Sequence, residues 1–420
     1  MPMNPLLNKR IVLGVSGSIA CYKSADLASK LTQAGAQVDV ILTQAATQFI
    51  TPLTFQSVTG RRAYTDADLW GNEAHVLHVG LAHGADLLVI APATANTLAK
   101  LAHGMSDDLL SVTALAATCP LLLAPAMDGG MFTHPATQAN LQLLTGRGAL
   151  VIGPEEGHLA SGLVARGRMS EPQTLLGRIR QRLAQNGPLQ GCKVVVTAGG
   201  TREAIDPVRF LSNHSSGKQG YALAQAALDA GGEVVLITTA ALPTPIGARQ
   251  VAVDSAQEML QAVLHECADA DVLIMAAAVA DFRPAQVAAQ KIKKQANTDV
   301  PTVDLVRNPD ILLEVAHQRQ ARGRPYVVVG FAAETENLLQ NAQAKLNQKG
   351  LNLLVANDVS ASDAGFAVDT NRVTILGEDG TAEPLPLMSK AEVAGKVIEK
   401  VIHMLAQTAT DGDAENRTLV

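Results

Sequence analysis

Two short glycine-containing loops in this chain have the residue types that hold phosphate groups. Ser16–Ile19 reads Ser-Gly-Ser-Ile and follows the apolar run Ile11–Val15, and Gly199–Arg202 reads Gly-Gly-Thr-Arg and follows the run Val194–Thr197. A loop between a buried strand and a helix N-terminus directs free backbone N–H groups at one spot, which suits a phosphate. Because one loop stands at the head of each half, we expect two phosphate-binding units, each with its own sheet. A plain turn is the alternative for such a loop.

Three further loops of the first half follow predicted strands and are rich in small, polar, glycine and proline residues. They are Thr43–Ala46, Ala91–Thr97 and Ala124–Met131. Ligands of an open α/β sheet collect beyond the carboxyl ends of its strands. We therefore expect these loops and Ser16–Ile19 to form one composite pocket.

Three histidines, His75, His78 and His83, precede the strand predicted at Leu87–Ala91. Their spacing would allow a metal site on a helix, but neither a cysteine nor a pair of carboxylates accompanies them. Histidines on a solvated surface are the alternative interpretation.

The loop motifs of the first half resemble the homo-oligomeric flavin-containing cysteine decarboxylase family, over roughly residues 10 to 180. The motifs are Gly17–Ile19, Ala91–Thr97, Gly104–Leu110 and Pro125–Met131. The resemblance implies that FMN lies against Ser16, Gly17, Ser18, Ile19, Thr43, Ala93, Thr94, Asn96 and Ser106. It also places the catalytic base in a His-x-x-Leu-Ala context, which here is His78–Ala82. A neutral imidazole at His78 would draw a proton from a substrate thiol while the flavin accepts a hydride from the adjacent carbon. His75 and His83 would then be solvated.

Two positions depart from the pattern of this family. Asp128 stands where the substrate-binding motif usually has asparagine, and Ser161 stands where the flap usually has a cysteine that protonates the ene-thiolate intermediate. A hydroxyl is a far weaker acid than a thiol. We therefore expect that the reaction either stops before the saturated thiol forms or uses another proton donor. Asp128 is the candidate donor if a substrate carboxylate raises its pKa. The alternative is that Asp128 only caps its loop and Ser161 is inert.

The second half has a further loop, Arg209–Gly220, whose Ser-Ser-Gly-Lys stretch opens a predicted helix at Tyr221–Ala230. It lacks the Walker A order, but a Ser/Gly loop with a lysine can still bind a phosphate. An ordinary helix N-cap with a solvated lysine is the alternative. Ala276–Arg283 follows a buried strand, and its small residues would let a base or sugar approach, with Asp281 able to take a ribose hydroxyl or a metal. Lys291–Lys294 is either a solvated face or a phosphate clamp.

These motifs, with three more, are similar to the phosphopantothenate–cysteine ligase family over about residues 191 to 405. The additional motifs are Asn308–Ile311, Gly330–Thr335 and Ala356–Asp358. With the decarboxylase motifs in front, the whole chain resembles the bacterial bifunctional coenzyme A biosynthesis proteins. The resemblance implies that 4′-phosphopantothenate is activated with CTP and Mg²⁺ to an acyl-cytidylate, which L-cysteine then attacks. The decarboxylase half would convert the product to 4′-phosphopantetheine.

The same resemblance assigns roles to residues of the second half. Asn213 and Lys291 would be catalytic, with Asn213 on the acyl group and Lys291 on the developing charge and the second half-reaction. Ser215, Ser216 and Gly217 would hold the pantothenate phosphate and, with Asn213, form the phosphopantothenate site. Asp281 would hold Mg²⁺. The CTP site would comprise Met275, Ala276, Ala277, Asp281, Lys291, Asn308, Pro309, Asp310, Ile311, Phe331, Lys345 and Lys349. Several lysines and a hard cation suit a pyrophosphate leaving group.

Composition limits the class of protein. A chain of 420 residues allows two or three domains, and 47% hydrophobic residues can form sizeable cores. A net charge of −6 disfavours nucleic acid as a partner. We see no apolar stretch that would span a membrane, no signal peptide, and no paired cysteines, so we expect a cytoplasmic protein with reduced thiols and no membrane partner. Small-molecule substrates are the expected partners, and the resemblance implies trimeric and dimeric contacts, hence a homo-oligomer, with a dodecamer as one form.

Continuous apolar runs alternate with helical sequence in both halves, which predicts an α/β fold with two doubly wound, mostly parallel-sheet Rossmann-like domains in tandem. We predict strands at Ile11–Val15, Val38–Leu42, Leu87–Ala91, Leu121–Ala124, Leu150–Ile152, Val194–Thr197, Val234–Ile237, Val272–Met275, Tyr326–Val329, Leu353–Ala356 and Asn371–Leu376. The Asn-Gly-Pro cluster at 186–188 divides a decarboxylase domain, residues 1–187, from a ligase domain, 188–407. Residues 408–420 are expected to be disordered.

Two other functions fit parts of these observations. An FMN-binding regulatory flavoprotein would keep only the ligase half active. A nicotinamide oxidoreductase would need Gly-x-Gly-x-x-Gly after its first strand, and Val15–Ala20 lacks that spacing.

Overall fold

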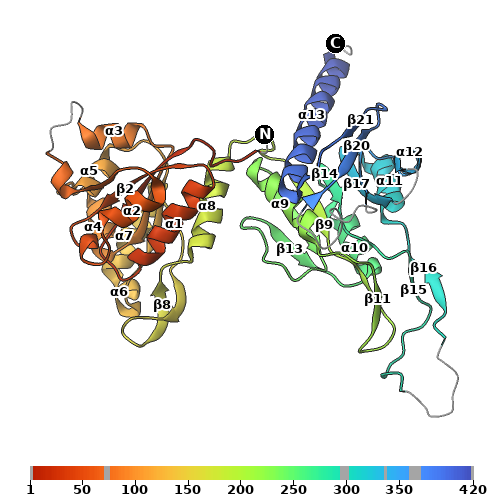
Figure 1. Ribbon diagram of the computed structural model, residues 1–420, viewed down its shortest axis with the longest axis horizontal. Coiled ribbons are helices and arrows are strands. Elements are labelled where there is room, and N and C mark those ends of the chain that lie inside the picture. Colours follow the sequence, from red (N-terminus) through yellow and green to blue (C-terminus); the bar gives the residue numbers. More distant parts are fainter. Residues whose placement is uncertain (1–2, 71–75, 294–301, 335–337, 359–369, 418–420) are drawn as a thin grey trace. The chain divides into compact units, whose positions relative to one another are not determined.

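The computed structural model describes residues 3–70, 76–293, 302–334, 338–358 and 370–417. The chain divides into two compact units, Asn4–Leu183 and Ala184–Val420, and the second includes Met1–Met3 (Figure 1). We call them the N-terminal and C-terminal units. The decarboxylase domain at residues 1–187 and the ligase domain at residues 188–407 stay predictions. His75 lies outside the described residues.

The N-terminal unit is built on a parallel sheet, whose order over the described residues is β3-β2-β1-β4-β5-β6. In this order the chain winds outward from β1 in one direction and then, from β4, in the other, so the switch point lies between β1 and β4. The strands are β1 (Arg10–Val15), β2 (Gln37–Leu42), β3 (Ala63–Thr65), β4 (Leu87–Ala93), β5 (Leu121–Pro125) and β6 (Leu150–Val151).

Helices cover both faces of this sheet. Ile11 and Leu13 of β1 pack on one face, whereas Val12 packs on the other, as the alternation of side chains along a strand requires. The first face is covered by α1 (Cys21–Gln33), α2 (Pro52–Thr59) and α8 (Pro172–Ala184); the second by α3 (Leu77–His83), α4 (Ala95–His103), α5 (Leu109–Ala116) and α7 (Pro135–Gly146). Short helical segments are η1 (Ala46–Gln48), η2 (Asp66–Asp68) and α6 (Gly129–Thr133). Burial on both faces explains why these strands read as unbroken apolar runs.

The C-terminal unit repeats this plan, with a described sheet order of β13-β12-β9-β14-β17-β18-β20-β21. The strands from β13 to β18 are parallel to one another, and β20 and β21 add an antiparallel hairpin at one edge. Their bounds are β9 (Lys193–Ala198), β12 (Glu233–Thr238), β13 (Arg249–Ala252), β14 (Val272–Met275), β17 (Val327–Glu334), β18 (Leu353–Asp358), β20 (Val373–Gly377) and β21 (Ala382–Pro384). Each strand predicted from the sequence is present, and the predicted pair of doubly wound α/β sheets is confirmed.

Helices of the C-terminal unit divide between the two faces of its sheet. Val194 and Val196 of β9 pack with α9 (Lys218–Asp229) and α13 (Lys390–Arg417), and Val195 packs with α10 (Ala256–Glu266), α11 (Ile311–Arg322) and α12 (Leu338–Gln348). Figure 1 shows α9 and α13 side by side. Helix α13 continues into the segment 408–420, for which the sequence predicts disorder; side chains beyond Gln407 lie outside the described ones.

Small antiparallel pairs lie outside the two main sheets. They are β7 (Glu155–His158) with β8 (Val164–Arg168), β10 (Arg202–Ala204) with β11 (Phe210–Ser212), β15 (Phe282–Pro284) with β16 (Leu305–Arg307), and β19 (Thr370–Asn371) with β22 (Met388–Ser389). We call β7, β8 and their turn the flap hairpin. We call residues 279–310 the connector; the pair β15–β16 joins its two ends, and residues 294–301 within it lie outside the described ones.

None of the cysteines is paired, and no described helix is long and apolar enough to cross a membrane. Burial raises the pKa of Cys267 to about 12 and also raises the pKa of Cys21 and Cys119. These thiols are therefore protonated and unreactive near neutral pH.

Candidate functional site

Ser16 joins the two loops at the switch point of the N-terminal sheet. It follows β1, is 1% exposed, and donates from Oγ to Pro92 O over 2.7 Å. The same Oγ accepts a hydrogen bond from Thr94 N at 3.0 Å. Thr94 in turn caps α4 by accepting from Thr97 N. The loops after β1 and β4, predicted to share a pocket, are thus held together by direct hydrogen bonds.

Gly17 brings the loop after β1 against the loop after β2. A Cβ at Gly17 would lie 2.5 Å from Ala45 Cβ, a distance that only a shift of the backbone could relieve. Helix α1 begins just beyond, and its N-cap Ala20 offers no side-chain cap, so the first N–H groups of α1 have no side-chain acceptor there. This arrangement suits a phosphate group. Other predicted FMN residues lie on the same edge, where strands end or helices begin: Ser18, Ile19, Thr43, Ala93 and Asn96. Ser106 lies instead in the loop between α4 and α5.

A cavity of about 520 Å³ opens between this edge and the flap hairpin. Asp128 and Ser161 both line it, and Ser161 Oγ donates to Asp128 Oδ2 over 2.7 Å. Asp128 also accepts from Gly130 N at 3.0 Å and is the N-cap of α6. Ser18 and Ile19 line the same cavity, so the two departures from the family pattern lie beside the predicted FMN loop.

The state of Asp128 without substrate is that of an ionised carboxylate. The hydrogen bond from Ser161, and then that from Gly130 N, lower the pKa of Asp128 below its ordinary value. A proton donor near neutral pH needs the opposite shift. The predicted role as an acid therefore depends on a substrate carboxylate that raises this pKa in the complex.

Lys23 is a residue of this cavity that the sequence did not single out. It is 4% exposed, donates to Met169 O at 2.8 Å and to Glu171 Oε1 at 3.0 Å, and so joins α1 to the segment that follows β8 of the flap hairpin. The Lys23 hydrogen bond lowers the pKa of Glu171. A buried lysine is uncommon without such partners, but a lysine on a helical face carries no signal of burial in the sequence.

His78 lies apart from this cavity. It is half-buried on α3, which packs against α5 on the second face of the sheet, and it is not among the residues that line the cavity with Asp128 and Ser161. His83 is exposed at the end of the same helix. The described part of the chain holds no group of three side chains able to ligate a metal, so His78 and His83 form no such site within it.

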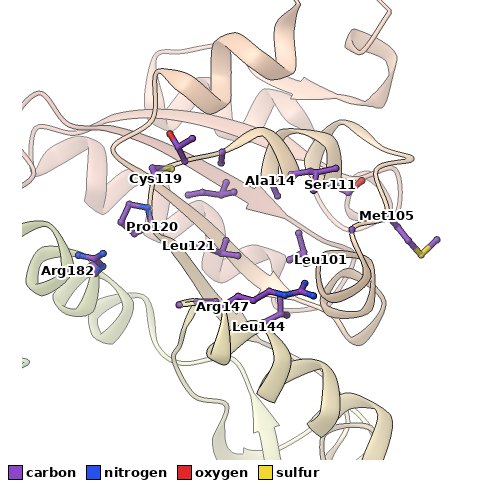
Figure 2. A pocket seen from close by; sticks show the side chains of 17 residues that line it. Leu101, Met105, Ser111, Ala114, Cys119, Pro120, Leu121, Leu144, Arg147 and Arg182 are labelled. Atoms are coloured by element: carbon purple, nitrogen blue, oxygen red, sulfur yellow. The ribbon is translucent and has the colours of Figure 1, made fainter.

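A different cavity of about 540 Å³ lies at the opposite edge of the same sheet (Figure 2). Leu88 and Leu121, at the amino ends of β4 and β5, line it together with Arg147, Arg182 and Cys119. None of the predicted site residues that the structure describes lies in its wall. The cavity of this unit that does contain predicted site residues is the one beside the flap hairpin.

The loops of the C-terminal unit meet at its own switch point, between β9 and β14. Thr201 N donates to Ala278 O, and Thr201 Oγ1 accepts from Ala280 N at 2.9 Å. Asn213 Nδ2 donates to Val279 O at 3.0 Å, which joins the Ser-Ser-Gly-Lys loop to the same strand end. The predicted loops after two neighbouring strands are therefore in contact.

Two adjoining cavities lie at this edge and share Asp281 and Phe331 in their walls. The first, about 470 Å³, is lined by the predicted residues Asn213, Ser215, Ser216, Gly217, Ala276, Ala277 and Lys345. The second, about 580 Å³, is lined by Met275, Ala277, Asn308, Pro309, Asp310, Ile311 and Lys349. The structure thus groups the predicted phosphopantothenate residues in one cavity and most of the predicted CTP residues in the other.

Three details of these cavities concern the groups that a ligand would meet. Gly217 has φ of +76°, and a Cβ there would lie 2.7 Å from Ala240 Cβ, so the loop that opens α9 requires glycine. Lys349 Nζ lies 3.0 Å from Asp310 Oδ2. Asn357 Oδ1 is buried in the first cavity with no hydrogen-bond partner among the described residues, which leaves it able to accept from a ligand. Asn357 belongs to the sequence motif Ala356–Asp358, but the sequence analysis assigned it no role.

Lys291 is the predicted residue that the structure does not bring to either cavity. It is exposed on the connector, and neither cavity wall includes it. Asp281 is exposed as well, and as a single carboxylate it fits Mg²⁺ only together with the phosphates of a nucleotide.

Comparison with known proteins agrees with this division of the chain. Residues 3–184 match the family described as Flavoprotein, and residues 189–405 match the family described as DNA/pantothenate metabolism flavoprotein C-terminal domain. The coenzyme A biosynthesis bifunctional protein CoaBC of Bacillus subtilis (strain 168) is 45% identical over 407 residues, 96% of this chain and 99% of that protein. The CoaBC proteins of Vibrio vulnificus (strain YJ016) and Mycobacterium tuberculosis (strain ATCC 25618 / H37Rv) are 46% and 44% identical over 95% of this chain, and over 98% and 97% of their own lengths.

Proposed function

This chain belongs to the family of bifunctional coenzyme A biosynthesis proteins, enzymes with a flavoprotein half and a ligase half, and we propose which substrates and residues it uses. The C-terminal unit joins 4′-phosphopantothenate to L-cysteine at the expense of CTP. The N-terminal unit then decarboxylates 4′-phosphopantothenoylcysteine to 4′-phosphopantetheine with FMN. The proposed domains are residues 1–187 and 188–407.

The residues at the carboxyl edge of the N-terminal sheet fit FMN. The close approach at Gly17 and the uncapped N-terminus of α1 suit its phosphate, and the Ser16–Thr94 hydrogen bond fixes the loop opposite. FMN, when bound, would accept a hydride from the substrate and return it after carbon dioxide has left. Beside it, His78 takes the proton of the substrate thiol, and Asp128 with Ser161 faces the carbon chain.

Because His78 and the Asp128–Ser161 pair do not line one cavity within a single copy, we propose that the enzyme is a homo-oligomer in which copies complete each other's decarboxylase sites. The resemblance to a trimeric family supports this arrangement. The N-terminal unit exposes large apolar side chains that contacts between copies would bury, among them Ile19, Phe49, Trp70, Val76 and Met105. A dodecamer would satisfy both the trimeric and the dimeric contacts.

Ligation in the C-terminal unit proceeds in two consecutive steps. The carboxylate of 4′-phosphopantothenate attacks the α-phosphorus of CTP, the bond to the β-phosphate breaks, and pyrophosphate leaves. The amine of cysteine then attacks the acyl carbon and expels CMP. Asn213 and the loop 215–217 hold the pantothenate part, and Asp281 would hold Mg²⁺, which would supply positive charge to the nucleotide phosphates.

The observation that carries the ligase proposal is the shared wall of the two cavities. Asp281 and Phe331 lie between the loop that would hold a phosphate and the residues that would hold the nucleotide, so an acyl group and an α-phosphorus could meet there.

The test is product analysis with the full chain, 4′-phosphopantothenate, cysteine, CTP and Mg²⁺, together with its absorption spectrum. We expect a yellow protein that makes 4′-phosphopantetheine, CMP and pyrophosphate. A protein that binds FMN but accumulates 4′-phosphopantothenoylcysteine would instead be the regulatory flavoprotein with only its ligase half active.

A further inference from the structure

A buried carboxylate holds the backbone immediately beside Lys291. Asp206 lies in the turn between β10 and β11 and is 2% exposed. Its Oδ2 accepts a hydrogen bond from Ile292 N at 3.1 Å. Arg209 Nη2 donates to Ile292 O at 2.9 Å, so both polar atoms of this one backbone residue are bound. Ile292 is therefore clamped at two points.

Asp206 and Arg209 form a rigid base for this clamp. Oδ1 of Asp206 accepts from Val208 N and Arg209 N, each at 2.8 Å, and Oδ2 accepts from Nε and Nη2 of Arg209 at 3.0 and 2.5 Å. The hydrogen bonds from Arg209 lower the pKa of Asp206 far below its ordinary value. Both guanidinium nitrogens converge on Oδ2, while the two backbone N–H groups hold Oδ1, so four charge-assisted hydrogen bonds fix the direction of the carboxylate.

The clamp belongs to a longer contact between the turn and the connector. Ala288 N donates to Ile205 O at 3.0 Å, so residues 288–292 lie along residues 205–209. The same turn leads through β11 to Asn213, whose side chain is bound to Val279 O at the start of the connector. One buried carboxylate thus ties together the segments that carry both predicted catalytic residues of the ligase half.

We propose that Asp206 is a positioning residue for ligation, which acts through Arg209 and Ile292 to fix the point from which Lys291 reaches the nucleotide cavity. This inference rests on the proposed role of Lys291. Lys291 is exposed and has no place in either cavity wall, so its reach toward the substrates depends on where its backbone is held. Displacement of a catalytic group by about 1 Å can cost a factor of about 100 in rate.

The test is a double-mutant cycle in the full chain, and its readout is the turnover rate at which the ligase half forms phosphopantothenoylcysteine. Asp206→Asn keeps the volume but removes the charge that pairs with Arg209, and we expect this rate to fall by about tenfold to 100-fold. In a Lys291→Gln background the same substitution should cause no further loss, because a positioning effect disappears with the residue it positions. A merely structural role would multiply the two losses, and that result would overturn the proposal, as would a wild-type turnover rate in Asp206→Asn.

Glu266→Gln is the matched control. Glu266 is also a buried carboxylate with arginine and lysine partners, Arg249 and Lys193, but it lies on α10 and lines neither ligase cavity. The substitution should lower the unfolding temperature and leave the turnover rate of ligation unchanged. If Asp206→Asn does not fold, Arg209→Gln removes the other arm of the clamp and must show the same dependence on Lys291. A wild-type rate of ligation in Lys291→Gln would contradict the proposed role of Lys291 itself. This result is distinct from a failure of the positioning role proposed for Asp206.

Discussion

Ser161 Oγ donates a hydrogen bond of 2.7 Å to Asp128 Oδ2, across a separation of 33 residues in the chain. The contact joins the flap hairpin to the N-cap of α6. The two residues that depart from the family pattern are therefore partners. While the Ser161 hydroxyl donates its hydrogen bond to the Asp128 carboxylate, it has no proton to transfer to the substrate. The acid of the reductive step must therefore be Asp128 after it has taken up a proton, or a group outside this pair.

Asp128→Asn separates these possibilities. The amide is the usual group of the family at this position, so we expect substrate to bind and carbon dioxide to leave, but without an acid the ene-thiol should accumulate. Loss of a general acid slows its step by about 10² to 10⁴-fold. Mass spectrometry of the products measures the ratio of ene-thiol to saturated thiol.

Two companion variants complete that experiment. Ser161→Ala should retain substantial turnover, and Ser161→Cys added to Asp128→Asn should restore the saturated thiol. Normal 4′-phosphopantetheine release by Asp128→Asn alone would place the acid elsewhere.

The protonation of Asp128 should depend on substrate. Its hydrogen bonds from Ser161 and Gly130 lower its pKa in the free enzyme, so the contact between flap and α6 is fully present above the ordinary carboxyl value of about 4 and is lost only as the pH falls through the lowered value. A substrate carboxylate should shift the pKa upward. In ¹³C NMR of flavin-free protein, we expect the Asp128 carboxyl to titrate below pH about 4 alone and at a higher pH with 4′-phosphopantothenoylcysteine. An unchanged titration would exclude the acid role.

The sequence could predict the sheets because their strands are buried on both faces. Val194–Val196 alternate between two cores and are all apolar, whereas β13, at the sheet edge, reads Arg-Gln-Val-Ala and gave no such signal. The ligand loops were predictable for the same reason, since each follows a recognisable strand. The clamp on Ile292, beside Lys291, was not: it joins Asp206 to Ile292 over 86 residues, and no local pattern encodes that contact. The Ser161–Asp128 hydrogen bond likewise depends on how the flap hairpin folds.

Gly17→Ala should release FMN. The new Cβ would lie 2.5 Å from Ala45 Cβ and push the loops after β1 and β2 apart, so we expect FMN affinity to fall by at least about tenfold, equivalent to about 1.4 kcal/mol. Fluorescence titration of flavin-free protein measures it. Gly146→Ala is the control, because no atom lies within 4 Å of its added Cβ. Equal FMN affinity in both variants would remove Gly17 from the site.

His78→Asn should slow decarboxylation by about 10² to 10⁴-fold, because it removes the proposed base. The unfolding temperature should be nearly unchanged, because the ring is only half-buried on α3. His83→Asn, on the exposed end of the same helix, is the control and should keep full activity. The measurement is carbon dioxide release from 4′-phosphopantothenoylcysteine. A fully active His78→Asn, or an equal loss in His75→Asn, would move the base to another residue.

Asn213→Ala should uncouple the two ligation steps. Its side chain donates to Val279 O at 3.0 Å, and the residue lines the cavity that would hold the pantothenate part, so its loss frees the acyl group at the point where cysteine must attack. We expect pyrophosphate still to be released from CTP, but the yield of 4′-phosphopantothenoylcysteine per pyrophosphate to fall by about tenfold or more, because the misplaced acyl-cytidylate is lost to water. Asn347→Ala, an exposed asparagine on α12, should keep the ratio at one product per pyrophosphate. Both quantities are measured in the same reaction, so a slower first step cannot imitate the effect. A ratio of one in Asn213→Ala would show that Asn213 serves the fold of its loop and not the intermediate.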